Sequence, residues 1–170
     1  MSFRLCDAFC GIGGYAAGAI SVGCEVGMGV EIDDRILRPF ASNTRGKAVC
    51  AAIGKDEIPW PQQAPDLLVH LSPPCTALSK ARAGSASEAD VEGGLELLRF
   101  SLDLVLDKGY SNWSLENVST ITTRALLDDY VQRHPERITY ATFDAADYGT
   151  PQTRVRLIAS SPATIRNMRE

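Results

Sequence analysis

The sequence lacks the features that mark membrane, secreted and metal-binding proteins. No apolar run approaches the roughly 20 residues that a membrane helix needs. The N-terminal stretch MSFRLCDAF has no signal-peptide layout, because Asp7 interrupts any apolar segment. The five cysteines form no CxxC pair and have no neighbouring histidine, so we expect neither a metal site nor a disulfide framework. These absences predict an intracellular protein, cytoplasmic or, if the source is viral, in a host compartment.

Positive charge is also scarce. The chain has 17 Lys and Arg against 21 Asp and Glu, a net charge of −4, and a pI near 5.2. A protein that grips DNA by itself usually carries a basic face, so this balance argues against strong independent DNA binding. No repeat or linker divides the 170 residues. We therefore expect one domain over residues 1–160 and a short C-terminal tail over residues 161–170.

Strand-like apolar runs alternate with amphipathic stretches along the chain. This alternation predicts an α/β fold, a doubly wound, mostly parallel, Rossmann-like sheet with helices on both faces. Strands are expected at 3–9, 24–32, 47–53, 66–72, 113–118, 138–149 and 154–160, and helices at 15–23, 33–46, 91–109 and 123–134. Segment 76–94 is rich in Ala, Ser and Gly and is predicted to be a mobile loop, a type that is usually functional or disordered.

The first motif, DAFCGIGG at Asp7–Gly14, follows the first expected strand. Glycines there let the chain turn tightly and let a ligand approach the following helix. Glu31 ends the second expected strand, a position that often bonds a ribose. Together they predict a cofactor that carries adenosine, either NAD or S-adenosylmethionine, although such a glycine turn can also serve strand–helix packing alone.

The second motif is the SPPC stretch that ends in Cys75. Two prolines cannot donate backbone hydrogen bonds, so the strand must stop there and hold Cys75 on a stiff backbone. A thiolate in that place can act as a nucleophile. The alternative is a buried structural cysteine, which is the commoner setting of a free thiol.

Two further motifs carry charge to the expected sheet edge. Glu116-Asn117-Val118 ends a strand with a carboxylate, which could equally be a loop ligand or cap. Gln152, Arg154 and Arg156 alternate, which places them on one face of the last expected strand. Such a row is costly to bury without a polar or anionic partner, and the alternative is an exposed edge strand.

DAFCGIGG, Glu31, PPC, ENV and QTRVR, in this order, resemble the cytosine-5 DNA methyltransferase family over residues 3–159. The resemblance implies a S-adenosylmethionine-dependent methyltransferase fold with an antiparallel last strand. It implies that Cys75 adds to cytosine C6 on a base flipped out of the duplex, and that segment 76–94 closes over that base. Glu116 would contact N3 and the exocyclic amine, Arg156 would contact O2, and Arg154 the same pocket or a phosphate. NAD has no use for these motifs.

The resemblance also implies binding residues. For S-adenosylmethionine these are Asp7, Phe9, Gly11, Ile12, Gly13, Gly14, Glu31, Ile32, Asp56 or the adjacent Glu57, and Pro74. For the DNA substrate they are Pro73, Asn117 and Gln152.

The sequence departs from the family in three places. Thr76 stands where the family usually has Gln, and Asp144 where it more often has Asn. After Ser160 the sequence has only SPATIRNMRE, where the resemblance leads us to expect a target-recognition domain and a C-terminal family segment. Three interpretations stay open: a minimal or split methyltransferase, completed by a second chain or a second copy and of the restriction-modification type; a non-catalytic or regulatory subunit; and the same chemistry on RNA.

Overall fold

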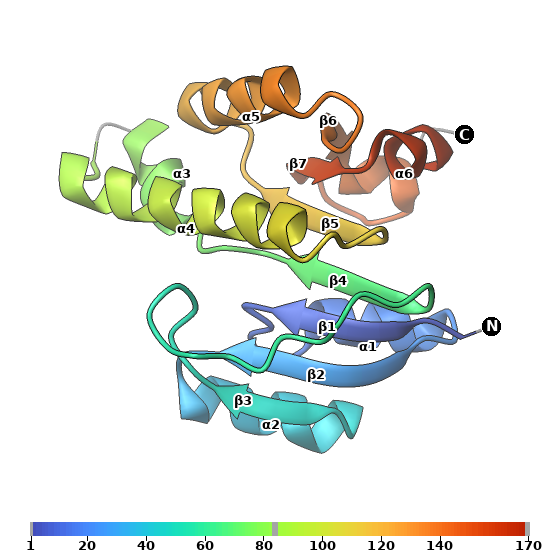
Figure 1. The fold of residues 1–170 in the computed structure, drawn as a ribbon. Coiled ribbons are helices and arrows are strands. Elements are labelled where there is room, and N and C mark those ends of the chain that lie inside the picture. Colours follow the sequence, from blue (N-terminus) through green and yellow to red (C-terminus); the bar gives the residue numbers. More distant parts are fainter. Residues whose placement is uncertain (1, 83–84, 169–170) are drawn as a thin grey trace. The chain divides into compact units, whose positions relative to one another are not determined.

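Helices and strands alternate along the chain in the computed structural model, which describes residues 2–82 and 85–168 (Figure 1). None of the helices in these ranges is long and apolar enough to cross a membrane. In chain order the elements are β1 (Arg4–Ala8), α1 (Gly14–Ser21), β2 (Glu25–Glu31), α2 (Asp34–Thr44), β3 (Lys47–Cys50), β4 (Leu67–Leu71), α3 (Thr76–Arg82), α4 (Glu88–Asp107), β5 (Trp113–Asn117), α5 (Ile121–Arg133), β6 (Thr139–Asp144), the 3₁₀ helix η1 (Ala145–Tyr148), β7 (Val155–Ser160) and α6 (Pro162–Asn167).

The strands form a mixed seven-stranded sheet in the order β3-β2-β1-β4-β5-β7-β6. β1 runs parallel to β2 and β4, and β2 runs parallel to β3. β7 is antiparallel to both β5 and β6. The chain proceeds outward from β1 to β3 and then returns to place β4 on the other side of β1, which makes a topological switch point between β1 and β4. The predicted α/β, mostly parallel sheet with an antiparallel last strand is confirmed.

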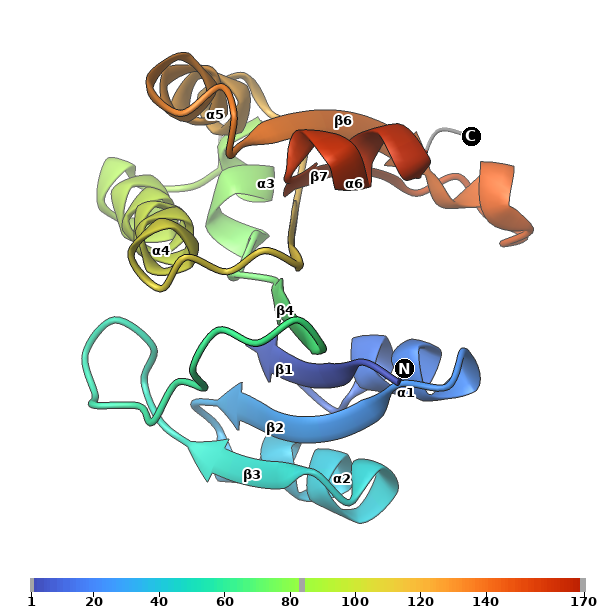
Figure 2. The same cartoon turned by 45° about the vertical axis from the view of Figure 1, so that its right-hand side comes forward.

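The chain divides into two compact units. Unit 1 consists of Met1–Ser72 with Leu104–Trp113, and unit 2 of Pro73–Asp103 with Ser114–Glu170. In unit 1, α1 and α2 pack side by side on one face of β1–β3 (Figures 1 and 2). In unit 2, α6 packs on β6 and β7, and α5 contacts β6. The cofactor residues expected from sequence, Pro74 excepted, fall in unit 1, and the expected catalytic residues all fall in unit 2.

The ring of Phe40 fixes the position of α2 on the sheet. Phe40 is fully buried in a cluster with Leu5, Leu37, Cys10, Ala16 and Ala19. A Cβ on Gly29 of β2 would stand 2.2 Å from the Phe40 ring, and one on Gly13 would stand 3.2 Å from it. Both glycines are therefore required by close approach, and the same ring that seats α2 also supports the turn before α1.

Several element predictions were wrong. Segment 76–94 is not a loop: Thr76–Arg82 forms α3 and α4 already begins at Glu88, while residues 83–84 lie outside the described ranges. Ala and Lys favour helix, and the Ser87 hydroxyl accepts from the Asp90 N–H at the start of α4. β3 ends at Cys50, β6 ends at Asp144, and the residues after Ser160, given no element from sequence, form α6 with Ser161 as its cap.

Candidate functional site

The glycine turn of unit 1 joins β1 to α1 through left-handed backbone. Phe9, Gly11 and Gly13 have φ of 61°, 54° and 94°. The Cys10 N–H donates to the Val30 carbonyl (3.0 Å), and the Gly13 N–H donates to the Cys10 carbonyl (2.9 Å). A Cβ added at Gly11 or Gly14 would meet no atom within 4 Å. Backbone hydrogen bonds thus hold the turn in place, and the space beside Gly11 and Gly14 is open. This arrangement suits a ligand that contacts the backbone of the turn.

Glu31, the last residue of β2, is held by backbone donors. Its Oε2 accepts from the Gly11 N–H (3.1 Å), and its Oε1 accepts from the N–H groups of Ile32 (2.8 Å) and Asp33 (3.3 Å). The carboxylate is therefore fixed beside the glycine turn, and its role as a ribose ligand stays a prediction. A carboxylate with unused lone pairs in this place can still accept from a pair of hydroxyls.

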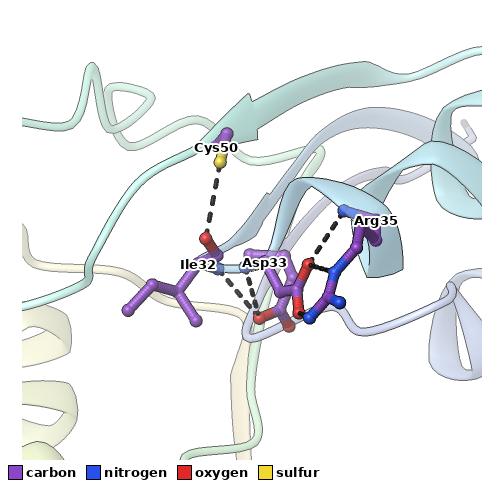
Figure 3. A network of polar contacts seen from close by, with 5 residues as sticks. Ile32, Asp33, Arg35 and Cys50 are labelled. Atoms are coloured by element: carbon purple, nitrogen blue, oxygen red, sulfur yellow. Dashed lines mark hydrogen bonds and ion pairs between the residues drawn. The ribbon is translucent and has the colours of Figure 1, made fainter.

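The apolar side chain of Ile32 and the polar groups of Asp33 and Cys50 lie at the ends of β2 and β3 (Figure 3). Ile32 is 68% exposed, and its carbonyl accepts from the Cys50 thiol at 3.5 Å. Asp33 caps α2 by accepting from the Arg35 N–H (2.9 Å), and its carboxylate pairs with the Arg35 guanidinium. These contacts lower the pKa of Asp33 to about 2. The Asp56 carboxylate accepts from the Ala52 N–H at 2.7 Å. Because Ala52 is two residues past the end of β3, this bond holds the carboxylate near that strand end.

Asp7 is fully buried in β1, and both of its carboxylate oxygens lack a hydrogen-bond partner. Burial raises the pKa of this carboxyl to about 7. The Ala16 N–H lowers it by a smaller amount, since it faces the carboxyl without reaching hydrogen-bond geometry. Asp7 lies in register with His70 of β4, whose ring stacks on Tyr15 at 3.5 Å. Burial lowers the pKa of His70 to about 3, so this imidazole is neutral at pH 7.

These residues fit S-adenosylmethionine. The open backbone at Gly11 and Gly14 has room for the methionine part, the fixed Glu31 carboxylate can bond ribose hydroxyls, and exposed Ile32 can cover an adenine face. Asp7 contributes a carboxyl whose ionised form a cationic ligand would stabilise. The cofactor contacts of these residues remain predictions.

In unit 2 the SPPC stretch leads directly into α3. Pro73 is buried, Pro74 is exposed and Cys75 is half-buried. The Cys75 carbonyl accepts from the Ser79 N–H (2.8 Å), so the thiol is carried at the start of the helix. The fully buried Asn117 amide donates to the Pro73 carbonyl (3.1 Å), and its own oxygen accepts from the Val118 N–H (2.8 Å). Asn117 therefore ties the end of β5 to the proline pair that precedes the cysteine.

Glu116 and Arg156 form an ion pair across β5 and β7. The Arg156 Nε lies 2.7 Å from the Glu116 Oε1, yet it lacks an aligned hydrogen-bond partner, so the contact is electrostatic. Arg156 also donates from Nη1 to the Val155 carbonyl at 2.9 Å. The pair lines a pocket of about 350 Å³ together with Phe143, Ala145, Tyr148, Thr150, Arg154, Ile158 and Met168. The structure thus brings three of the predicted catalytic side chains, Glu116, Arg154 and Arg156, into one cavity.

The QTRVR motif is not one strand, contrary to expectation. β7 begins at Val155, and Gln152 lies exposed in the bend before it. Asp144 explains this geometry, because its Oδ1 accepts from the Arg154 N–H (2.8 Å) and the Ala146 N–H (3.1 Å) and so ends β6 in a closed loop. Gln152 does not line the pocket that contains the two arginines.

The sequence motifs did not indicate the aromatic wall of this pocket. The rings of Phe143 and Tyr148 lie 6.2 Å apart, and the Tyr148 hydroxyl donates to the Met168 carbonyl (3.2 Å). Phe143 lies in β6, and Tyr148 ends the 3₁₀ helix η1 that follows it. Phe143 stands opposite Arg156 in the β6–β7 pairing, a register that the sequence motifs did not give.

Comparison with known proteins finds relatives that match nearly the whole chain. Residues 3–164 match the family model of C-5 cytosine-specific DNA methylases. Type II methyltransferase M.MthTI of Methanothermobacter thermautotrophicus is 28% identical over 166 residues, which cover 92% of this chain and 48% of the relative. The chain spans about half the length of this curated relative.

Solved structures share the fold at low identity. One is a putative DNA modification methyltransferase encoded in an E. coli prophage, with a TM-score of 0.68, 21% identity and coverage of 96% of this chain and 48% of the other. Another is S. pombe Dnmt2, with a TM-score of 0.60, 14% identity and coverage of 92% and 48%. The match of the family model over nearly the whole chain decides its assignment: the chain belongs to the C-5 cytosine-specific DNA methylase family.

Proposed function

We propose that this chain transfers a methyl group from S-adenosylmethionine to C5 of cytosine in DNA through a covalent adduct with Cys75. The observation that supports this most is the pocket of unit 2, in which Glu116, Arg154 and Arg156 converge. Glu116 is followed in β5 by Asn117, whose amide donates to the Pro73 carbonyl, two residues before Cys75. A nucleophile and a carboxylate–guanidinium pair are the groups that attack on a cytosine ring requires.

In the proposed reaction the Cys75 thiolate adds to C6, and the electron density of the C5–C6 double bond becomes nucleophilic at C5. Glu116 shares a proton with N3, and Arg156 holds O2, so that the negative charge that develops on the ring is neutralised. S-adenosylmethionine supplies the methyl group as an electrophile. Loss of the C5 proton to a base then restores the double bond and expels the Cys75 thiolate. Because C5 and C6 are hidden in a duplex, the cytosine must first leave the stack.

The Glu116–Arg156 ion pair must open for this role. In the pocket as it stands each side chain neutralises the other. A cytosine offers Glu116 a donor at its exocyclic amine and Arg156 an acceptor at O2, so the base can replace the pair without leaving either charge unpaired. Asn117 acts as a positioning residue in this scheme, since its amide bonds the Pro73 carbonyl rather than facing the pocket.

The test is transfer of labelled methyl from S-adenosylmethionine to mixed-sequence DNA, with DNA that contains 5-fluorocytosine as a trap. Fluorine at C5 cannot leave as a cation, so the adduct should persist as a protein–DNA complex resistant to denaturation. Cys75→Ser should abolish both transfer and trapping. The matched control is Cys50→Ser, since Cys50 is the more exposed thiol and is expected to leave trapping intact.

Outcomes with other substrates separate the alternatives. Trapping on RNA but not DNA would contradict the DNA assignment and keep the chemistry. Retained cofactor binding without transfer to either polymer would favour a non-catalytic or regulatory subunit. Transfer that appears only when a second polypeptide is added, or only above a threshold concentration of this chain, would indicate completion by a target-recognition chain or by self-association.

A further inference from the structure

A pocket in unit 1 opens at the amino ends of the strands, away from the glycine turn and Glu31 at their carboxyl ends. Its volume is about 420 Å³, within the range of small-molecule sites. Arg4, Gly27 and Lys47 line it from three adjacent strands, and Pro59 with residues 61–64 forms its other wall.

A β-bulge shapes the floor of this pocket. Leu5 pairs with Val26 but Cys6 pairs with Met28, which leaves Gly27 as the extra residue of β2. A Cβ on Gly27 would stand 2.9 Å from Arg4 Cγ and 3.2 Å from its Cδ. The missing side chain therefore allows Arg4 to lie across β2, and bulges often re-aim a side chain in this way near functional sites.

Two cations line this pocket. β2 separates β1 from β3, so an arginine that crosses β2 extends toward Lys47, which lies in register with Met28. Within residues 2–82 and 85–168, no ion pair or side-chain hydrogen bond involves Arg4 or Lys47. The described lining contains no carboxylate. Two exposed like charges on one pocket repel each other weakly, and an anion bound between them would be attracted by both.

The remaining lining sets the kind of anion. The Gln62 amide is exposed, and no hydrogen bond within the described ranges occupies it. Gln63, in contrast, is committed to Ser111 through both of its amide atoms. Apolar surface comes from Pro59 and Pro61, whereas the lining residues Leu5 and Leu67 are themselves buried.

We propose that this pocket binds an organic phosphate monoester, with the dianionic phosphate between Arg4 and Lys47 and the apolar body against the proline wall. A phosphate monoester carries close to two negative charges at neutral pH, which matches two cations better than a single carboxylate does. The Arg4 guanidinium can bond two phosphate oxygens, and Lys47 binds as a point charge. Gln62 donates to a third oxygen.

The test uses phenyl phosphate and the full chain, with amide chemical shifts followed by two-dimensional NMR. Saturable shifts are expected at Arg4, Met28, Lys47 and Gln62, with a Kd of about 1 mM or tighter. Inorganic phosphate, which lacks the apolar body, should bind more weakly. Because the readout is mapped by residue, it does not depend on methyl transfer or on cofactor binding.

Variants decide between a site and general attraction. Arg4→Gln and Lys47→Gln should each weaken binding by about tenfold, whereas the matched control Lys108→Gln, an exposed cation of unit 1 outside the pocket, should leave it unchanged. Lys47 lies at an exposed edge of the sheet, so its variant is expected to fold, and the dispersion of the amide signals checks this directly. Chemical shifts that rise linearly with phenyl phosphate concentration would refute the site. So would a Lys108→Gln variant whose binding weakens as much as that of the two pocket variants.

Discussion

Two glutamates near the carboxyl ends of strands are held in opposite ways. Glu31 in unit 1 accepts from three backbone N–H groups, whereas Glu116 in unit 2 meets one guanidinium through an ion pair. Backbone donors are fixed by the turn itself and need no rearrangement to keep the carboxylate in place. A guanidinium on a long side chain can move. The difference is consistent with the proposed roles, in which Glu31 binds the cofactor in one pose and Glu116 exchanges Arg156 for the cytosine.

Glu116→Gln should have the largest effect of the changes that probe this comparison. The amide cannot share a proton with the ring, so we expect kcat to fall by about 100-fold or more with little change in cofactor affinity. The measurement is single-turnover methyl transfer alongside calorimetric binding of S-adenosylmethionine. Glu92→Gln, which breaks an exposed ion pair with Arg99 on α4, is the matched control and should keep full activity. A Glu116 variant of normal rate would contradict the proposed protonation.

Asp7 sharpens the comparison, because it is a third carboxyl near a strand end and has neither kind of partner. Its folded pKa of about 7 lies above the unfolded value of 3.8, so the folded state holds its proton more tightly. Stability therefore falls as pH rises from about 4 to 7 and stays low above that. Asp7→Asn should raise the free energy of unfolding at pH 8 by about 2 kcal/mol and change little at pH 4.

Urea unfolding of the unchanged protein and of Asp7→Asn, from pH 4 to pH 8, measures this difference in the free energy of unfolding. His70 acts in the other direction, because its lowered pKa costs stability as pH falls below about 6.5. Three further groups interact electrostatically with Asp7: the Cys6 thiol, the Cys10 thiol and the Ala16 N–H. Tyr15 stacks on His70. Both proteins share these groups, so their difference isolates Asp7. An equal advantage of the variant at pH 4 and pH 8 would show that packing rather than ionisation is responsible.

Asn117 tests whether the loop before Cys75 depends on one side chain. Asn117→Ala leaves the buried Pro73 carbonyl and Val118 N–H without their partner, which should cost about 2 kcal/mol of stability. Because the amide positions the proline pair, kcat should fall while the Km for S-adenosylmethionine changes little. Thermal unfolding and steady-state kinetics measure the two effects. Thr122→Ala, at the exposed first turn of α5, is the control.

How much of this site sequence could predict depends on how each residue is placed. Glu31 and Glu116 end strands set by apolar periodicity, so the sheet edge places them from local pattern alone. Arg154 and Gln152 were placed wrongly on a strand, because the Asp144 carboxylate closes a loop ten residues away in the chain. Segment 76–94 was mistaken for a loop because helix formation there depends on packing, as with buried Leu78, and not on composition.

Glu31→Ala gives the smallest expected effect and addresses the preorganised side of the comparison. Removing the carboxylate should weaken S-adenosylmethionine binding by about tenfold, the value of one or two hydrogen bonds to ribose hydroxyls, and leave single-turnover kcat within about twofold. Asp34→Ala, which removes a carboxylate from an exposed surface pair on α2, serves as the control for charge. If the Gly11 turn relies on Glu31, amide exchange at Gly11 should also quicken, since its N–H loses its acceptor. Unchanged affinity with faster exchange would make Glu31 a brace for the turn and not a cofactor ligand.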